Sequence, residues 1–295
     1  MAKKRKHSFL LIAAIVTAVI ALLVTLVFVA CSSRLKVTEY EICDARIQDE
    51  VRLVFLSDLH RSRYGEDEAE LIAAVENLEP DAVLLGGDIF DEADDFEIAQ
   101  ELLLTLGEKY PCYFVSGNHE YGTTTNEQIE HFRSILKDAG IDCLSREKRS
   151  LTVKDTTVDI YGIDNEMRYI VYRENDPIGS GDRSFYRDLE ELGQNVDPSR
   201  FSLLLCHAPE AEKFAETSFD LILSGHTHGG QWRFPPLING VYAPGQGLFP
   251  DYAYGRYTLS DKTTLIVGSG LCTSYDVPRV FNRPEIVLVT LKSAG

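Results

Sequence analysis

The first part of the hydrophobic pattern is an uninterrupted apolar run over Phe9–Ala30, in which Thr17 and Thr25 are the only polar residues. A helix of this length reaches about 33 Å, enough to cross a hydrocarbon core of about 30 Å. The run therefore predicts a transmembrane helix at residues 9–30. A buried core helix and a cleaved signal peptide are the alternatives, although the apolar region of a signal peptide is usually only about 7–15 residues long.

Basic residues precede this run. The segment MAKKRKH makes residues 1–8 positive, so we expect them in the cytoplasm and the rest of the chain on the other side of a cell membrane, attached by a single pass. The four residues before and including Cys31, Phe28-Val29-Ala30-Cys31, loosely resemble a bacterial lipoprotein cleavage site, which would attach a lipid to Cys31 instead. Both interpretations predict a tethered domain.

Beyond the apolar run, short apolar stretches alternate with amphipathic helical patterns. Strands are predicted at 51–56, 82–85 and 113–115, and the helices that follow them lie near 66–78, 96–108 and 126–139. This rhythm is typical of a mostly parallel sheet with helices on its faces. We expect residues 31–49 to be a stalk that enters the first strand, and residues 50–295 to form one domain.

The last part of the pattern is richer in strands. It predicts a hairpin over Ser150–Tyr161 that turns at Asp155-Thr156, followed by strands at 201–206, 221–223, within 257–267 and at 286–291. Together with the first half, these strands predict an α/β fold with two facing mixed sheets and outer helices, a four-layer α-β-β-α sandwich.

Charge and cysteine content limit the classes of function that the chain could have. The first 38 residues hold six basic residues and no acidic one, so the remaining chain has 23 basic and all 46 acidic residues, a formal charge of −23. Such a negatively charged surface repels phosphate backbones, so we expect no non-specific binding to nucleic acid. The six cysteines show no metal-binding spacing. Cys112 and Cys143, which begin two candidate neighbouring strands, are the pair to test for a disulfide, with unpaired thiols as the alternative.

Polar residues of metal-ligating type follow almost every predicted strand. They are Asp58 and His60, Asp88, Asn118 and His119, His207, and finally His226 and His228. In open α/β sheets ligands bind outside the carboxyl ends of strands, so these residues are expected to meet in one crevice. Imidazole, carboxylate and amide donors without a thiolate favour zinc, iron or manganese, and a shared carboxylate suits a pair of ions about 3.5–4 Å apart. Cys206 alternates with His207 along a strand and is expected to face the core.

These motifs resemble the calcineurin-like metallophosphoesterases. The motifs that carry the resemblance are DLH at 58–60, GD at 87–88 followed by Asp91, GNHE at 117–120, His207, and GHTH at 225–228. The GGQ after GHTH and the segment GLCTSYDVPRVFNRPEI at 270–286 are similar to the membrane-anchored bacterial branch of that family. The resemblance covers most of the chain beyond the anchor.

The resemblance implies a role for each residue. Asp58, His60 and His228 would hold one divalent ion, Asn118, His207 and His226 a second, and Asp88 would bridge them, with a hydroxide between the ions as nucleophile. His119 would be the general acid, with Asp91 orienting its imidazole. A helix cap near residues 92–96 is the alternative for Asp91, and a structural role is the alternative for His119.

Two further groups have open interpretations. Arg61 and Arg63 either reach a substrate phosphate or are solvated loop charges. An aromatic group near the second histidine pair either lines an apolar rim for a lipid or sugar-nucleotide substrate or packs a long loop; its members are Trp232, Tyr242, Phe249, Tyr252 and Tyr254.

The resemblance thus predicts a membrane-tethered, dinuclear phosphoesterase of manganese, iron or zinc type. A phosphodiester, lipid-linked or pyrophosphate bond is the first choice of substrate, because the anchor places the site beside the membrane. The alternatives are a phosphomonoesterase of the same fold, a mononuclear hydrolase of carboxylic esters or amides, and a non-catalytic metal-binding scaffold. The sequence does not fix the oligomeric state.

Overall fold

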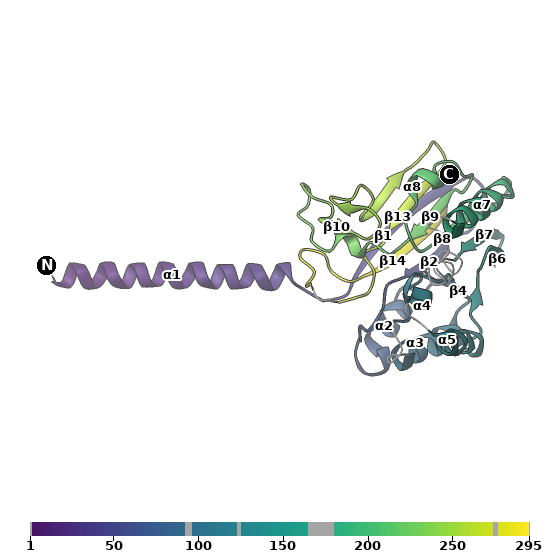
Figure 1. Cartoon of the computed structure of the whole chain (residues 1–295). Helices are drawn as coiled ribbons and strands as arrows, with labels where there is room; N and C mark the ends of the chain where they lie inside the picture. Colours follow the sequence, from purple (N-terminus) through teal and green to yellow (C-terminus); the bar gives the residue numbers. More distant parts are fainter. Residues whose placement is uncertain (1, 92–95, 123–124, 165–179, 274–276, 295) are drawn as a thin grey trace.

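The computed structural model describes residues 2–91, 96–122, 125–164, 180–273 and 277–294. Helix α1 (Ala2–Ala30) projects away from the rest of the chain, which forms one folded body at its C-terminal end (Figure 1). Within α1, the stretch Ile12–Ala30 has a mean hydropathy of 3.0, and none of it is buried against the protein. This helix is long and apolar enough to cross a membrane, as the sequence predicts.

The first sheet has six strands in the order β1-β14-β2-β3-β4-β5. Its strands are β1 (Lys36–Asp44), β14 (Glu285–Ser293), β2 (Val51–Leu56), β3 (Ala82–Leu85), β4 (Cys112–Phe114) and β5 (Asp142–Cys143). Strands β2 to β5 are parallel neighbours, β14 is antiparallel to β2, and β1 is parallel to β14. The sheet is therefore mixed, with its parallel half formed by the strand–helix repeats that the sequence predicts.

The second sheet also has six strands, in the order β12-β13-β9-β8-β7-β6. Its strands are β12 (Gly255–Thr258), β13 (Thr264–Val267), β9 (Leu221–Ser224), β8 (Phe201–Cys206), β7 (Thr156–Ile163) and β6 (Glu147–Val153). Strands β7, β8, β9 and β13 are parallel, and the hairpin partners β6 and β12 are antiparallel edges.

Alternation along the strands explains why the two sheets stack. In β2, Leu53 and Phe55 belong to the core between the sheets, while Val54 and Leu56 belong to the core under the helices. Strand β8 divides in the same way, with Leu203 facing the other sheet. Because successive side chains point to opposite faces, a strand that is apolar at every position is buried on both.

Helices cover the two outer faces. Helices α2 (Ala69–Glu76), α3 (Phe96–Lys109) and α5 (Asn126–Asp138) pack on the first sheet, and α7 (Ser180–Gln194) and α8 (Ala211–Phe214) on the second. The four-layer α-β-β-α sandwich is thus confirmed (Figure 1). The short elements are η1 (Glu66–Glu68), α4 (His119–Gly122), η2 (His228–Gly230), β10 (Tyr242–Ala243) and β11 (Gly247–Leu248).

Three local expectations differ from the structure. Part of the expected stalk, residues 36–44, is the edge strand β1, which pairs with β14 along its whole length. The hairpin turn is one residue earlier than predicted, because Val153 pairs with Thr156 and Lys154 takes a positive φ of 51°. Strands β4 and β5 are neighbours as expected, yet Cys143 lies opposite Phe114, and the thiols of Cys112 and Cys143 are both free.

Candidate metal centre

The chain brings the predicted ligands together because the carboxyl ends of five parallel strands point to one region. In the first sheet, β2 leads to Asp58 and His60, and β3 leads to Asp88. The next strand, β4, leads to Asn118 and His119, whereas β8 and β9 of the second sheet lead to His207 and to His226 and His228. The centre lies where the two sheets meet at these ends, as expected for a ligand site in an α/β fold.

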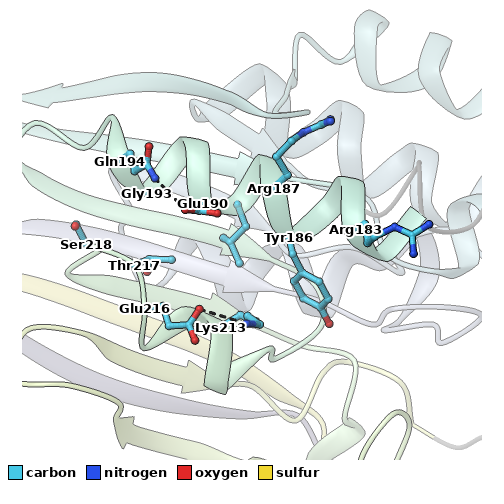
Figure 2. A pocket seen from close by; sticks show the side chains of 11 residues that line it. Arg183, Tyr186, Arg187, Glu190, Gly193, Gln194, Lys213, Glu216, Thr217 and Ser218 are labelled. Atoms are coloured by element: carbon cyan, nitrogen blue, oxygen red, sulfur yellow. Dashed lines mark hydrogen bonds and ion pairs between the residues drawn. The ribbon is translucent and has the colours of Figure 1, made fainter. Parts of the chain in front are cut away.

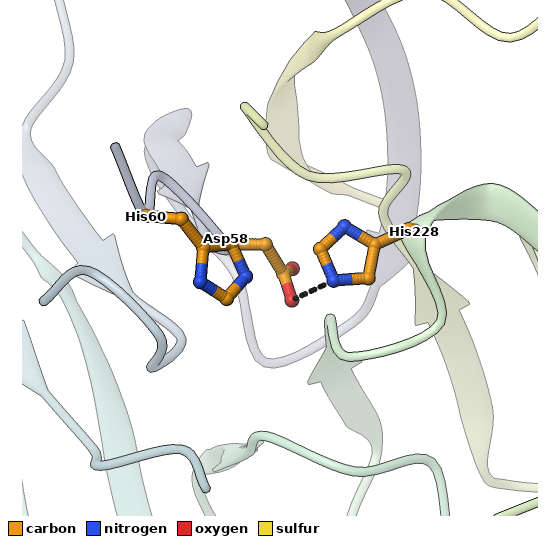
Figure 3. A group of neighbouring side chains, drawn as sticks. All are labelled: Asp58, His60 and His228. Atoms are coloured by element: carbon orange, nitrogen blue, oxygen red, sulfur yellow. Dashed lines mark ion pairs between the residues drawn. The ribbon is translucent and has the colours of Figure 1, made fainter. Parts of the chain in front are cut away.

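The first group of donors consists of Asp58, His60 and His228, shown in Figure 3. Their donor atoms all lie within 4.8 Å of one another, and His228 Nε2 is 3.8 Å from Asp58 Oδ1. The rings of His60 and His228 stack with centroids 5.1 Å apart. Asp58 and His60 are buried, so the three side chains converge on a small desolvated space.

The second group consists of Asp88, His207 and His226. His207 Nε2 lies 3.1 Å from Asp88 Oδ2 and 3.2 Å from His226 Nδ1. Asp88 also forms a third group with His60 and His119, and His60 Nε2 is 3.8 Å from the same Oδ2 atom. The Asp88 carboxylate therefore lies between the two sets of imidazoles.

A buried amide oxygen lies on the loop that follows β4. Asn118 Oδ1 is inaccessible to solvent and accepts no hydrogen bond from any residue that the structure describes. A buried polar atom without a partner costs free energy unless something binds it. The grouped imidazole and carboxylate donors, together with this unpartnered amide oxygen, fit divalent cations of the zinc, iron or manganese type.

The backbone is strained at the predicted ligands. Five of them have φ values in the left-handed region that non-glycine residues rarely adopt: Asp58 (52°), His60 (50°), Asp88 (51°), His226 (68°) and His228 (48°). Such strain persists only where the surrounding structure enforces it, and it concentrates at functional sites.

Neighbouring glycines allow the close approach of these carboxylates. A Cβ atom at Gly117 would lie 2.1 Å from Asp88 Oδ1, and one at Gly225 would lie 2.4 Å from Asp58 Oδ2. Any side chain there would displace a carboxylate from the centre, which explains why the GNHE and GHTH motifs begin with glycine.

Hydrogen bonds from the backbone orient the donors. His207 Nδ1 lies 2.7 Å from the carbonyl oxygen of Gly86, and donation there leaves Nε2 as the atom that faces Asp88. The backbone N–H of His119 donates to Asp88 Oδ1 over 2.8 Å, and that of His226 donates to Asp58 Oδ1 over 2.9 Å. Each carboxylate is thus fixed by the loop that follows a different strand.

Glu120 holds together the loops that follow β3 and β4. Its buried carboxylate accepts hydrogen bonds from the backbone N–H groups of Gly117, Asp88, Ile89 and Phe90. Burial and the nearby Asp88 raise the pKa of Glu120, whereas the four donors favour its ionised form. The position of Glu120 at the end of the GNHE motif was the sequence signal for this supporting role, which the motif's predicted ligands did not include.

Burial and nearby charges shift the pKa values of the imidazoles in opposite directions. Burial lowers the pKa of His60, and burial lowers that of His228 well below its usual value, an effect to which the nearby His60 and Arg279 side chains add because neither site favours a second positive charge. Both are therefore neutral in the metal-free chain, which is the form that binds metal. Burial also opposes a charge on His207, but the Asp88 carboxylate outweighs it and raises the pKa of His207.

His119 and Asp91 form the predicted pair. His119 Nδ1 lies 2.9 Å from Asp91 Oδ1, and the side chain of His119 is 28% exposed whereas that of Asp91 is 2% exposed. Burial opposes the charged form of His119, but the hydrogen bond to Asp91 and the charge of Asp88 outweigh it and raise its pKa to about 9. The alternative role of Asp91 as a helix cap involves residues 92–95, which lie outside the described residues.

The two arginines after the DLH motif differ. Arg61 is largely exposed, and its Nε lies 3.2 Å from Asp91 Oδ2, on the carboxylate that also holds His119. Arg63 is an exposed charge near Glu68, whose pKa is raised to about 7 by burial while the Tyr64 backbone N–H and the charge of Arg63 oppose that shift. Cys206 belongs to the core under α7 and α8, which confirms that it faces away from the centre.

Sequence analysis missed a buried arginine. Arg279 is 4% exposed, and its Nη1 and Nη2 atoms donate no hydrogen bond within the described part of the chain. Burial lowers the pKa of Arg279, the nearby Asp58 carboxylate opposes that shift, and the charge of Arg279 adds to the lowering of the His228 pKa. It lies in the segment 270–286, where residues 274–276 are outside the description, and nothing in its local pattern distinguished it from an exposed loop arginine.

A separate hollow lies on the outer face of the second sheet, between α7 and α8 (Figure 2). It has a volume of about 550 Å³. The residues that line it include two bonded pairs, Lys213 with Glu216 and Gln194 with Glu190. None of the predicted ligands lines it, so this groove and the metal centre are different places.

Comparisons with known proteins agree with the geometry. Residues 51–230 match the family model described as calcineurin-like phosphoesterase. The phosphodiesterase YaeI of Escherichia coli is 30% identical over 252 residues, which are 81% of this chain and 82% of that protein. A metallophosphoesterase of Aquifex aeolicus is 29% identical over 251 residues, with 83% and 87% covered.

A vertebrate relative is also similar. The zebrafish (Danio rerio) transmembrane protein with metallophosphoesterase domain is 30% identical over 273 residues, which are 88% of this chain and 58% of that protein. The chain belongs to the calcineurin-like phosphoesterase family. It is accordingly a metallophosphoesterase, a hydrolase of phosphoric ester bonds that uses divalent metal ions.

Proposed function

We propose that the chain is a membrane-tethered phosphodiesterase with a dinuclear centre. Asp58, His60 and His228 would hold one divalent ion, Asn118, His207 and His226 would hold the other, and Asp88 would be shared between them. The single observation that carries it is the position of Asp88 Oδ2, 3.1 Å from His207 Nε2 on one side and 3.8 Å from His60 Nε2 on the other. A carboxylate between two sets of imidazoles suits a pair of cations.

Hydrolysis adds water across a P–O bond, so the departing alkoxide needs a proton. Bound divalent ions would neutralise the phosphate charge and acidify a coordinated water. His119 supplies the proton for the leaving group. Its Nδ1–H points to Asp91, which favours the imidazolium and leaves Nε2 as the donating atom. The products are an alcohol and a phosphomonoester.

Two observations favour a diester beside a membrane. The relative YaeI is named a phosphodiesterase, and helix α1 is apolar enough to hold the domain at a bilayer. We place the basic residues 1–8 in the cytoplasm and the catalytic domain, residues 50–295 with the strand β1 that precedes them, outside it. A lipid-linked or pyrophosphate bond in the envelope is then the substrate within reach.

The test uses the full chain in detergent, stripped with a chelator and reloaded with Mn²⁺, Zn²⁺ or Fe²⁺. Rates are compared on bis(p-nitrophenyl) phosphate and p-nitrophenyl phosphate, and bound metal is counted. We expect two ions per chain and a higher kcat/KM on the diester. A preference for the monoester would make the protein a phosphomonoesterase, one ion per chain would contradict the dinuclear centre, and metal binding without turnover would indicate a scaffold.

A further inference from the structure

An exposed apolar surface lies on the loops that follow the GHTH motif. We call it the apolar rim, and its members are Trp232, Phe234, Leu237, Leu248, Phe249 and Phe281. Leu237 is 88% exposed, Leu248 70% and Phe249 65%, whereas large apolar residues of the remaining described domain are mostly buried. A contiguous exposed apolar surface of this kind indicates a binding surface.

The expected aromatic group divides between the rim and the interior. Tyr252 packs its ring against Tyr257 at a centroid distance of 5.1 Å, and Tyr254 bonds to Glu285 and Lys36. These two residues pack the long loop. Trp232 and Phe249 instead face outward, so loop packing and an exposed rim are both present in one segment.

The rim lies beside the end of helix α1. The backbone N–H of Phe281 donates to the carbonyl oxygen of Ala30, the last residue of α1, over 2.6 Å. The ring of Phe281 packs edge-on against Phe234 with centroids 5.9 Å apart. Figure 1 shows the loops around β10, which hold Leu248 and Phe249, at the same end of the domain that α1 enters.

The link between α1 and the domain is held in place. Arg283 Nε donates to the carbonyl oxygen of Arg34 and Nη2 donates to that of Leu35, each over 2.8 Å. Lys36 then begins β1 with a bond to the carbonyl oxygen of Pro284. A tether bonded in this way restricts rotation of the domain about its anchor, so one face of the domain is held toward the membrane surface.

We propose that the apolar rim inserts into the interfacial region of the bilayer that α1 crosses. The occupant is the lipid surface itself, because the rim adjoins the apolar helix α1 and consists of one tryptophan, three phenylalanines and two leucines, residue types that bury in the membrane interface. This inference rests on the proposed membrane tether. It does not depend on which phosphate ester the site hydrolyses.

The same loops connect the rim to the metal centre. Asn282, next to Phe281, donates through Nδ2 to the carbonyl oxygens of His228 and Gln231, over 2.7 and 3.2 Å. Trp232 Nε1 donates to the carbonyl oxygen of Pro278 over 2.9 Å. Insertion of the rim would therefore also set the position of the His228 loop relative to the bilayer.

Trp232 is the single tryptophan of the chain, so its fluorescence reports on the rim alone. The full chain is reconstituted in vesicles of phosphatidylcholine and phosphatidylglycerol that contain a lipid with a nitroxide near the carbonyl end of its acyl chain. We expect this lipid to remove most of the Trp232 emission and soluble acrylamide to quench it weakly. Full quenching by acrylamide with no loss to the nitroxide lipid would overturn the inference.

Two variants sharpen the test. Leu237→Glu combined with Leu248→Glu should restore Trp232 emission in nitroxide vesicles and increase acrylamide quenching, because charged groups oppose insertion. Ser218→Glu, an exposed change in the groove of Figure 2, is the matched control and should leave both signals unchanged. Equal quenching in the double variant and the control would count against the rim.

Carbonate extraction separates the inference from the proposals on which it rests. Retention of the wild-type chain in the vesicles supports the anchor, and its removal overturns both anchor and rim. Turnover of bis(p-nitrophenyl) phosphate in detergent tests the catalytic proposal alone, because that substrate is soluble.

Discussion

At the scale of single residues, the position of Asp88 decides how the centre works. Its Oδ2 atom faces imidazoles from both sheets, and its Oδ1 atom accepts the backbone N–H of His119. Replacing Asp88 by Asn removes the negative charge but keeps the shape. We therefore expect the Asp88→Asn variant to lose both bound metal and activity.

Metal content by elemental analysis and turnover of the diester check this expectation. Asp81→Asn is the control and should keep both ions. Asp81 directly precedes the first residue of β3, whereas Asp88 follows the last one. Two ions per chain in the Asp88→Asn variant would rule out the bridging role.

A second prediction concerns His119. His119→Asn should leave both ions bound and slow turnover by about 10²–10⁴-fold, the usual contribution of a general acid. The loss should be larger for alkyl than for nitrophenyl leaving groups, because a poorer leaving group needs the proton more. His131→Asn, an exposed histidine on α5, is the control. Unchanged rates on an alkyl ester would contradict the assignment.

The pH profile gives a third prediction. Because the pKa of His119 is raised to about 9 in the metal-free chain, the imidazolium is present below that pH and is lost as the pH rises through it. Bound cations lower the pKa of a nearby imidazolium, so the alkaline decline of kcat in the loaded enzyme should begin below about pH 9. The His119→Asn variant should lack this limb, and an unchanged limb would assign it to another group.

At the scale of elements, the second sheet depends on a buried carboxylate. Asp159 on β7 accepts hydrogen bonds from Ser150 and Lys148 of the edge strand β6, over 2.6 and 3.0 Å. Arg200, just before β8, donates to it over 3.4 Å. Asp159 therefore ties three neighbouring strands together at one point.

Asp159→Asn should destabilise the domain by about 1–2 kcal/mol at neutral pH. This is the low part of the range for hydrogen bonds to a charged group, because Lys148 and Arg200 are partly exposed. Burial opposes ionisation of Asp159, but the bonds from Ser150 and Lys148 outweigh it and lower its pKa. The stabilisation is thus complete above about pH 3.9, the unfolded value, and disappears as the pH falls through the lower folded value.

Denaturant unfolding of the full chain in detergent at pH 7 and at low pH measures this difference. Asp155→Asn, in the exposed hairpin turn, is the control and should change stability little at either pH. A difference between Asp159→Asn and wild type that persists at low pH would show that lost charge is not the cause.

At the scale of the whole molecule, the link between anchor and domain carries its own prediction. Arg283→Ala removes the two hydrogen bonds to Arg34 and Leu35, each contributing about 0.5–1.5 kcal/mol, so the link should open several-fold more often. Limited trypsin cleavage at Arg34 in reconstituted protein should accelerate accordingly. Arg256→Ala, which loses a single bond to Glu41, is the control. Equal cleavage of the two variants would indicate a link that is already loose.

Much of the fold was predictable because it depends on local patterns. Strands that are buried on both faces, such as β3 and β8, read as continuous apolar runs, and α5 begins with a Thr125 capping box that precedes an amphipathic pattern. The place of β1 in the sheet was missed because its only partner among the strands that the structure describes is β14, almost 250 residues away. No local pattern can reveal such a partner.

The sequence by itself determined which residues carry metal-ligating side chains, where the long apolar helix lies and which family the motifs resemble, because each of these depends on residues close together in the chain. The tertiary structure alone decided that Asp88 faces both sets of imidazoles, that Glu120 supports four backbone donors, and that the rim lies against Ala30. These depend on distances between strands and loops far apart in the chain, which only the packing of the two sheets sets.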